Sequence, residues 1–443
     1  MSSPTKTIVS FGLVFSRKGP YATVARAMHN GALLAVREVN ALPHSPITLA
    51  PIGDDPGGKP ERYASICADL LAHHGVRHVI GCYTSSSRKE CVPLFEKADA
   101  LLWYPSHYEG FESSANVLYT GAVPNQHLLP LADYMQRTFG SRAFCIGSNY
   151  IWAWENNRIL RERLGCTGGE VLAERYFPIG ETEFEHVIDA IIDARPSFVF
   201  STLIGTSAYR FMTALRAACI ARGIDQPRAL PIASCTLSEP ELEEIGPAAA
   251  DGHITASVYF SSIASPANHR FVAAYDAQFD AGPAACADAE AAYIAVKLLA
   301  RALETAGPAA ACADVKRAAS TITLEAPQGP VRIDAETWHA ALTPRIARST
   351  AQMRFEIIKQ APAPVAADPY LVWNSPASGP TRRPRPSCAW RHERVARHPE
   401  LPRLPRPLVG PARRRGGRAD RRAASPRPDA RLSRRDRRRR RRP

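Results

Sequence analysis

The sequence predicts an α/β protein made of two doubly wound parallel-sheet lobes with a cleft between them. Short apolar runs suited to buried strands alternate with stretches of helical period, and this alternation occurs twice in series. Parallel strands joined by right-handed crossovers build a sheet that helices cover. The chain has 443 residues, and a usual domain size of about 100–200 residues then predicts two or three domains.

The elements of the first series follow from hydrophobic period and turn residues. The predicted helix at 22–40 places Val24, Met28 and Gly31 on one face. Pro60 suits the first turn of the next helix, because a proline there gives up no helical hydrogen bond. The predicted strands are 8–15, 47–52, 76–80 and 101–104, and the predicted helices are 22–40, 60–74 and 85–100.

The second series begins after a predicted helix at 126–138. Its expected strands are 143–147, 171–177, 198–202, 230–233 and 254–259, and its expected helices are 154–164, 183–194 and 207–222. Three further helices are expected at 268–279, 285–306 and 310–322. We assign two late strands, 331–333 and 355–358, to the first lobe, which would make the lobes discontinuous.

These elements divide the chain into four parts. Residues 1–122 form lobe 1, residues 123–260 form lobe 2, and residues 261–374 supply helices and strands that the lobes share. From 375 to 443 the apolar period stops and Arg, Pro, Ala and Gly dominate, so this tail is expected to be disordered. After residue 380, 24 arginines and five acidic residues give a formal charge of +19, so the first 380 residues carry −5 of the chain's +14.

Two interpretations of the arginine-rich tail stay open. Such a segment can bind RNA, DNA or acidic lipid through phosphate groups. A shifted reading frame in GC-rich coding DNA produces the same composition, with much Arg and no Lys. We prefer the second interpretation or an inert tail, so direct nucleic-acid binding is not expected.

Cysteine spacing and the N-terminus bear on the compartment. The ten cysteines show no C-x-x-C pair, so neither a disulfide framework nor a metal site is expected. The N-terminus lacks the basic and apolar segments of a signal peptide, and no apolar run approaches the roughly 20 residues of a membrane span. We therefore expect a cytoplasmic protein without a membrane segment or a cofactor.

No motif supports an enzyme. Neither a Walker A sequence nor a G-x-G-x-x-G sequence occurs. Ser86–Lys89 matches the S-x-x-K motif of penicillin-binding enzymes, but no K-T-G follows and the predicted fold differs from theirs. An amidohydrolase that uses Ser86 or Cys82 is kept as a minor hypothesis, and the prediction is a protein that is not an enzyme.

Hydroxyl and aromatic residues recur where predicted strands end. In an open α/β sheet this edge is where ligands bind, and a helix start adds outward N–H groups that suit a carbonyl oxygen. The set contains neutral donors, acceptors and ring faces, which fit a small uncharged amide or urea. Its members are Tyr83, Ser85, Tyr104, Ser106, Tyr150, Trp152 and Thr206, with Ser234–Thr236 after a further strand.

Several stretches resemble one family of bacterial regulators. They include Gly81–Tyr83, Tyr108–Glu112, Gly31–Val36 (GALLAV), Asp55–Gly58 (DPGG), Tyr259–Ile263 (YFSSI), Ala326–Val331 (APQGPV) and Asp368–Tyr370. The chain is similar over residues 7–374 to the amide-sensing negative regulators of aliphatic amidase operons. These are cytoplasmic relatives of type I periplasmic binding proteins, close to the urea and short-chain amide binders of ABC transporters.

The resemblance implies a two-lobed flytrap that closes on an acetamide-like ligand. It also implies that Tyr83, Ser85, Tyr104, Ser106, Tyr150 and Trp152 form the pocket, with Thr206 beside them. Ser85 would hold the carbonyl oxygen. Ser106 stands where the regulators have Thr, and Trp152 where they have Tyr, so the preferred amide is expected to differ.

The resemblance also implies a partner. In the family the regulator silences an RNA-binding antitermination protein, and the inducing amide releases it. A homo-oligomer is left open. The alternative is the substrate-binding component of a urea or short-chain amide ABC transporter, which has the same fold and a different partner.

Overall fold

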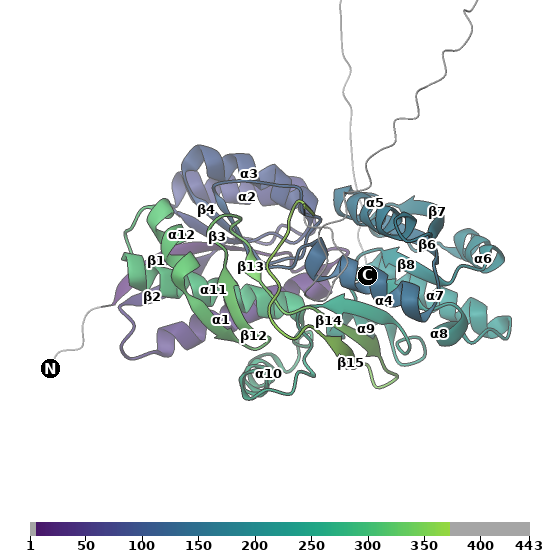
Figure 1. Cartoon of the computed structure of the whole chain (residues 1–443). Helices are drawn as coiled ribbons and strands as arrows, with labels where there is room; N and C mark the ends of the chain where they lie inside the picture. Colours follow the sequence, from purple (N-terminus) through teal and green to yellow (C-terminus); the bar gives the residue numbers. More distant parts are fainter. Residues whose placement is uncertain (1–5, 373–443) are drawn as a thin grey trace, which may run out of the picture. The chain divides into compact units, whose positions relative to one another are not determined.

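The computed structural model describes residues 6–372 of the chain. Two open sheets dominate this part (Figure 1). The first is parallel throughout and the second is mostly parallel, and helices pack against both, so the predicted α/β class with parallel-sheet lobes is confirmed. The tail at 375–443 lies outside the described residues, and its predicted disorder stays a prediction.

The first sheet has five parallel strands in the order β2-β1-β3-β4-β5. The strands are β1 (Thr7–Val14), β2 (Ile47–Ile52), β3 (His78–Gly81), β4 (Leu101–Tyr104) and β5 (Val117–Tyr119). Helices α1 (Ala22–Ala41), α2 (Pro60–His73) and α3 (Ser85–Ala98) connect them. The order reverses beside β1, because β2 lies on one side of it and β3 on the other, as in a doubly wound sheet.

The second sheet has seven strands in the order β15-β14-β10-β9-β8-β6-β7. Its parallel strands are β6 (Arg142–Ser148), β7 (Glu170–Phe177), β8 (Phe198–Thr202), β9 (Ile232–Ser234) and β10 (Ile254–Ser257). Two antiparallel strands, β14 (Arg345–Ser349) and β15 (Phe355–Gln360), complete it. Its helices are α4 (Leu128–Thr138), α5 (Ile151–Gly165), α6 (Glu185–Ala194), α7 (Thr206–Ala221), α8 (Gln226–Ala229) and α9 (Glu239–Ile245).

The remaining elements of the described chain are the short 3-10 helix η1 (Pro124–Gln126), three α-helices and a small antiparallel sheet. The helices are α10 (Pro266–Phe279), α11 (Ala287–Ala306) and α12 (Cys312–Thr321). The sheet contains β11 (Thr323–Ala326), β12 (Gly329–Ile333) and β13 (Ala340–Ala341). Helix α11 packs along α1 (Figure 1).

The assignment of the late strand 355–358 to the first lobe is wrong, because it belongs to the second sheet, whereas the assignment of 331–333 to the first lobe stays a prediction. β12 pairs in the small sheet, and β15 pairs with β14 at the edge of the second sheet. A short apolar strand does not encode its partner, because any exposed sheet edge offers the same backbone groups. The lobe boundaries at residues 122 and 260 stay predictions.

The cysteines are scattered along the sequence because most of them occupy positions in the protein core. Eight of the nine described cysteines are buried, and burial raises the pKa of thiols such as Cys145 and Cys235. Cys145 and Cys235 therefore behave as small apolar side chains with inert thiols. Within residues 6–372 no helix is both long enough and apolar enough to cross a membrane.

Candidate ligand-binding site

The start of α3 lies at the carboxyl end of β3, where the sequence places a hydroxyl run. Thr84 caps the helix, since its Oγ1 accepts the Ser87 N–H at 3.2 Å. The Ser85 side chain is thereby free of the capping role. Its buried hydroxyl donates to Glu109 Oε2 and accepts from Arg88 Nη1 at 3.2 Å.

The predicted role of Ser85 as a donor to a carbonyl oxygen stays a prediction, and the hydrogen bonds of Ser85 in the described structure do not favour it. A serine hydroxyl has one proton, and Ser85 gives it to Glu109. The sequence shows Ser85 at a strand end, but the hydrogen-bond direction depends on Glu109, which lies in the loop after β4.

Arg88 forms the centre of a buried charged network beside Ser85. Its guanidinium pairs with Glu109 Oε1 at 3.1 Å and with Glu112 Oε1 at 2.7 Å. It also lies over the rings of Tyr104 and Tyr108, at 4.6 and 4.5 Å from their centroids. Burial opposes ionisation of Glu112, but Arg88 outweighs it and lowers the pKa of Glu112 to about 2.

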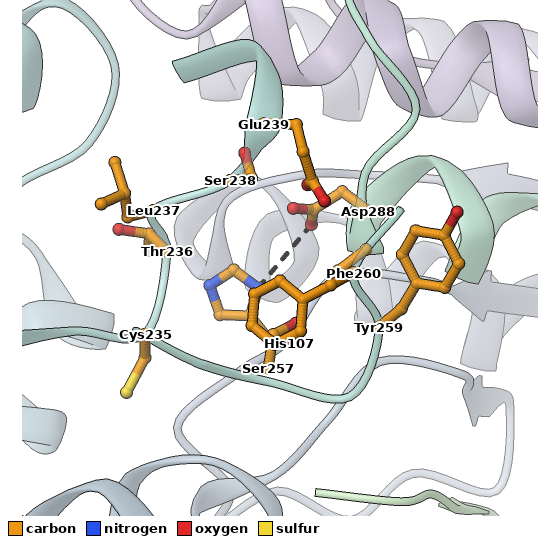
Figure 2. Close-up of a pocket in the computed structure, with 11 residues that line it drawn as sticks. His107, Cys235, Thr236, Leu237, Ser238, Glu239, Ser257, Tyr259, Phe260 and Asp288 are labelled. Carbon is orange, nitrogen blue, oxygen red and sulfur yellow. Dashed lines mark ion pairs between the residues drawn. The ribbon is translucent and has the colours of Figure 1, made fainter. Parts of the chain in front are cut away.

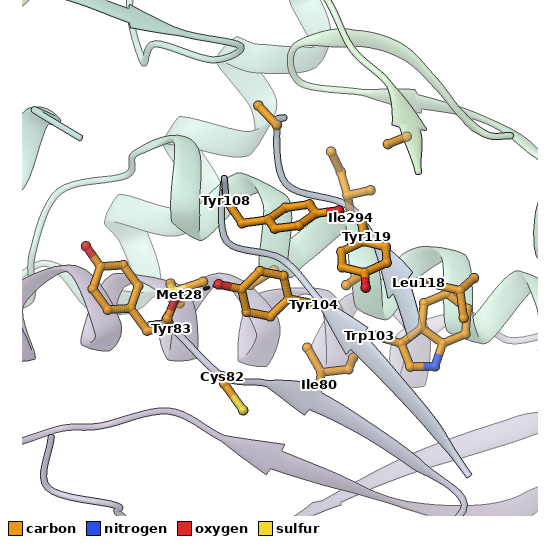
Figure 3. Packing of buried hydrophobic residues seen from close by; sticks show 14 of the residues in the cluster. Met28, Ile80, Cys82, Tyr83, Trp103, Tyr104, Tyr108, Leu118, Tyr119 and Ile294 are labelled. Atoms are coloured by element: carbon orange, nitrogen blue, oxygen red, sulfur yellow. Dashed lines mark hydrogen bonds between the residues drawn. The ribbon is translucent and has the colours of Figure 1, made fainter. Parts of the chain in front are cut away.

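Tyr83 and Tyr104 lie together at the ends of β3 and β4 (Figure 3). The Tyr104 hydroxyl donates to the Tyr83 carbonyl at 2.8 Å, which ties the two strand ends. The Tyr83 ring packs on Tyr21, with centroids 5.0 Å apart. Burial raises the pKa of Tyr83, and the nearby carboxyl groups of Asp288 and Glu241 raise it further.

Tyr150 and Trp152 lie at the start of α5, just after strand β6 of the second sheet, and Tyr150 is near Tyr83 and Tyr104. Tyr150 precedes α5, and its ring stacks on Trp152 with centroids 6.3 Å apart. Burial is the main cause that raises the pKa of Tyr150, and Tyr104 and Glu109, which lie at the end of β4 and in the loop after it, raise this pKa further. The structure therefore brings Tyr83, Ser85, Tyr104, Tyr150 and Trp152 to one region.

Ser106 and Thr206 have other surroundings. Ser106 is buried next to the Tyr104 hydroxyl. Its backbone packs closely against Gly121, because a Cβ added at Gly121 would lie only 2.1 Å from the Ser106 backbone oxygen. The backbone N–H and the side-chain hydroxyl of Thr206 both donate hydrogen bonds to the Pro20 carbonyl, at 2.9 and 3.2 Å. Its hydroxyl proton is used within the protein, so Thr206 joins two loops.

A pocket next to the aromatic group is lined largely by residues outside the predicted ligand-binding set (Figure 2). His107 follows β4, and its Nδ1 lies 3.7 Å from Asp288 Oδ1 at the start of α11. The His107 ring also packs edge-on against Trp152, with centroids 5.4 Å apart, which joins the pocket to the aromatic group. The lining comprises His107, Cys235, Thr236, Leu237, Ser238, Glu239, Ser257, Tyr259, Phe260, Ala287 and Asp288.

Sequence signals for this pocket were weak. Ser234–Thr236 was recognised as a polar run after a strand, and Cys235 and Thr236 do line the pocket. Asp288 was missed because it lies at the start of a helix far along the chain. Ser238 and Glu241 form a capping box at the start of α9, a signal that the sequence contains and that could have located this loop.

The pocket is acidic. Glu239 and Asp288 line it, and neither this pocket nor its neighbour, which shares His107 and Asp288, has a Lys or Arg among its described lining residues. Burial raises the pKa of Glu239 to about 7, and that of nearby Glu241 to about 8. An anionic ligand would therefore meet no compensating charge here.

Two buried imidazole nitrogens stand out in the neighbouring pocket. His127 lines it, and apart from the Tyr108 backbone neither ring nitrogen has a hydrogen-bond partner within the described structure. Burial lowers the pKa of His127 to about 3, so the ring is neutral and offers one donor and one acceptor. No group of three or more His, Cys, Asp or Glu within residues 6–372 could hold a metal ion.

Comparison with protein families identifies one match that spans most of the chain. The model of a periplasmic binding protein domain matches residues 9–376.

Solved structures with the same fold include binding proteins of ABC transporters. One is a solute binding protein from Rhodopseudomonas palustris HaA2 in complex with p-hydroxybenzoic acid, with a TM-score of 0.73, 19% identity, and coverage of 83% of this chain and 100% of that one. Another, from R. palustris BisB5 in complex with 3,4-dihydroxybenzoic acid, has a TM-score of 0.71 and 19% identity over 80% of this chain and 97% of that one.

A third similar structure binds an amino acid. The branched-chain amino acid transporter substrate binding protein LivJ from Streptococcus pneumoniae, in complex with isoleucine, has a TM-score of 0.68 and 19% identity over 80% of this chain and 99% of that one. At this identity the three structures establish a shared fold and no shared ligand.

Proposed function

The chain belongs to the periplasmic binding protein domain family, and from that premise we propose that it binds a small neutral amide or urea and acts as a ligand sensor. The matched family and the similar structures are solute-binding proteins, which supports binding without catalysis. The ligand would lie in the region of Tyr83, Ser85, Tyr104, Ser106, Tyr150, Trp152 and the pocket that His107 and Asp288 line.

The observation that carries this proposal is the charge of the site. Carboxylate ligands such as hydroxybenzoates and amino acids need a cation or a set of free donors. The buried cation Arg88 is already paired with Glu109 and Glu112, and the lining of the pocket within residues 6–372 contains Glu239 and Asp288 without Lys or Arg. An uncharged ligand rich in N–H donors is the chemical complement of this surface.

The aromatic residues support a short ligand. Tyr83, Tyr104, Tyr150 and Trp152 offer ring faces that would enclose a small alkyl group. Trp152 also carries a buried indole N–H without a hydrogen-bond partner in the described structure, which could donate to the carbonyl oxygen in place of Ser85.

As a sensor, the protein would respond to the ligand by a change of conformation. The ligand shifts this equilibrium only by its difference in affinity for the two states. By resemblance, the output would be release of an RNA-binding antitermination partner in the cytoplasm, and so expression of an amidase operon. Recovery of the RNA-binding protein with this chain, and its loss on addition of acetamide, would support that role.

Calorimetric titration tests the ligand class. Acetamide, propionamide, urea and formamide should bind, whereas p-hydroxybenzoate and isoleucine should not. Binding of an anion or an amino acid, with no heat from any of the neutral ligands, would refute the proposal.

A second candidate is the substrate-binding component of an ABC transporter. The similar structures named above favour it, because they are transporter proteins. Cell fractionation separates the two roles. A sensor that controls antitermination should be found in the cytoplasm, whereas a transporter component should be found outside the inner membrane.

A further inference from the structure

We propose that Glu109 sets the hydrogen-bond polarity of the ligand site through Ser85, so that Ser85 meets the ligand as an acceptor and selects an N–H donor. This inference rests on the proposed function, since it concerns the same ligand. Glu109 acts through Ser85 and is therefore a positioning residue. It is absent from the set of ligand-binding residues that the sequence suggested.

The polarity follows from counting protons and lone pairs on one oxygen. Ser85 Oγ has one proton and two lone pairs. The proton is donated to Glu109 Oε2, and one lone pair accepts Arg88 Nη1 at 3.2 Å. What remains is a single lone pair, so any further partner of Ser85 must bring its own hydrogen.

The arrangement cannot reverse while Glu109 is a carboxylate. A carboxylate has no proton to donate, and Glu109 is ion-paired with Arg88 at 3.1 Å and with Lys89 at 3.7 Å. Arg88 is in turn fixed by Glu112 and by the rings of Tyr104 and Tyr108. Because the Arg88 side chain has no exposed surface and that of Glu109 is 2% exposed, water is not available to exchange with these bonds.

Ser85 and Glu109 lie where the ligand is proposed to bind. Ser85 follows the carboxyl end of β3, and the Tyr104 ring lies between the Arg88 guanidinium and the Tyr83 carbonyl that its hydroxyl contacts. Tyr150 approaches from the second sheet closely enough for Tyr104, Glu109 and Arg88 to influence its hydroxyl. The network thus contacts Tyr104 and lies within electrostatic reach of Tyr150.

The consequence is a preference between two molecules of nearly equal shape. Acetamide and acetone differ in one group, an NH₂ in the first and a CH₃ in the second. The NH₂ group of acetamide can donate a hydrogen bond to Ser85 Oγ. Acetone has a methyl group at that position, so the remaining lone pair of Ser85 would have no hydrogen-bond donor. The wild-type protein should bind acetamide at least about tenfold more tightly than acetone.

The decisive variant is Glu109→Gln. The carboxamide oxygen should face Arg88, which leaves the NH₂ group facing Ser85. Ser85 then accepts from both neighbours, and its proton becomes available to a ligand oxygen. Competition titration should show the acetamide-to-acetone affinity ratio falling by about tenfold or more. Glu112→Gln is the matched control, because it removes the same charge from the same guanidinium without touching Ser85, and the ratio should stay at its wild-type value.

Ser85→Ala provides a second test that does not depend on Glu109. It should lower the affinity ratio by a similar factor, and Glu109→Gln should have no further effect on the ratio in the Ser85→Ala background. If wild-type protein binds acetamide but Ser85→Ala or a folded Glu109→Gln keeps the wild-type ratio, the inference fails. If no variant and no wild-type protein binds acetamide at all, the proposed function fails instead.

Discussion

Arg88 carries its charge in a side chain without exposed surface. Taking a charge out of water costs several kcal/mol unless partners compensate it. Here two glutamates and two tyrosine rings surround the guanidinium. The neighbouring Lys89 pairs with the same glutamates, but its side chain is 41% exposed.

Arg88→Met should therefore destabilise the protein by about 3 kcal/mol or more, because it leaves Glu109 and Glu112 buried with little compensation. Lys89→Met is the matched control and should cost less than about 1 kcal/mol, since exposed ion pairs contribute little. Urea unfolding of both variants measures the difference. Equal losses would mean that Lys89 and water suffice to stabilise the two glutamates.

Glu290 links stability to pH. It is fully buried and accepts the Gln328 N–H at 3.1 Å and the Gln328 amide at 2.8 Å. Burial raises its pKa from 4.5 to about 7. The folded state thus keeps a proton that the unfolded state has lost, so the stability contribution is fully present below pH 4.5 and disappears as pH rises to about 7.

Glu290→Gln should flatten this dependence, because glutamine does not ionise. Between pH 5 and 8 the wild-type protein should lose about 2–3 kcal/mol more than the variant. Thermal unfolding at several pH values provides the measurement. Glu325→Gln, an exposed change in β11, should leave the wild-type slope intact, and an equal effect of both changes would exclude Glu290 as the source.

At the scale of elements, the contact between α1 and α11 depends on one missing side chain. A Cβ at Gly31 would lie 2.0 Å from the backbone oxygen of Ala289. The two helices can approach this closely only because Gly31 has no Cβ. The sequence placed Gly31 on the buried face of its helix but did not show which helix it would meet.

Gly31→Ala should destabilise the protein by about 1–3 kcal/mol through overpacking, even though alanine favours helix by up to about 1 kcal/mol. Gly165→Ala is the control within a helix, because its Cβ would meet no atom within 4 Å. That change should be neutral or stabilising in denaturant unfolding. A neutral Gly31→Ala would show that α11 can shift without loss.

Which elements the sequence predicted depended on their length and period. Long amphipathic helices such as α1 and α11, and the apolar strands β1 and β8, were found close to their observed bounds. β5 has three residues and α9 seven, too few for a period to be recognised. β14 was missed because arginines interrupt its apolar pattern, although Arg345 is buried and donates to the Gln328 carbonyl at 2.8 Å.

At the scale of the molecule, the loops that precede α1 and α7 meet at Pro20 and Gly205. The Thr206 N–H donates to the Pro20 carbonyl at 2.9 Å, and a Cβ at Gly205 would lie 2.1 Å from that oxygen. The first loop belongs to the five-stranded sheet and the second to the seven-stranded sheet. If the ligand favours approach of the two sheets, this contact contributes to its affinity.

Gly205→Ala should weaken acetamide binding by about tenfold, because the added Cβ separates the two loops. Gly223→Ala controls for backbone strain, since Gly223 also has a positive φ but no atom within 4 Å of its Cβ position. It should affect unfolding and leave affinity unchanged. Loss of affinity in both variants would attribute the effect to strain alone.

The sequence by itself determined the alternation of strands and helices, and with it the parallel sheets. It also determined that hydroxyl and aromatic residues cluster at strand ends, because these features depend on local period and on the common edge of parallel strands. The tertiary structure decided the partner of each late strand and the residues of the pocket. Glu109, His107 and Asp288 acquire their roles from neighbours distant in the chain, and the direction of the Ser85 hydrogen bond depends on the carboxylate that packing places beside it.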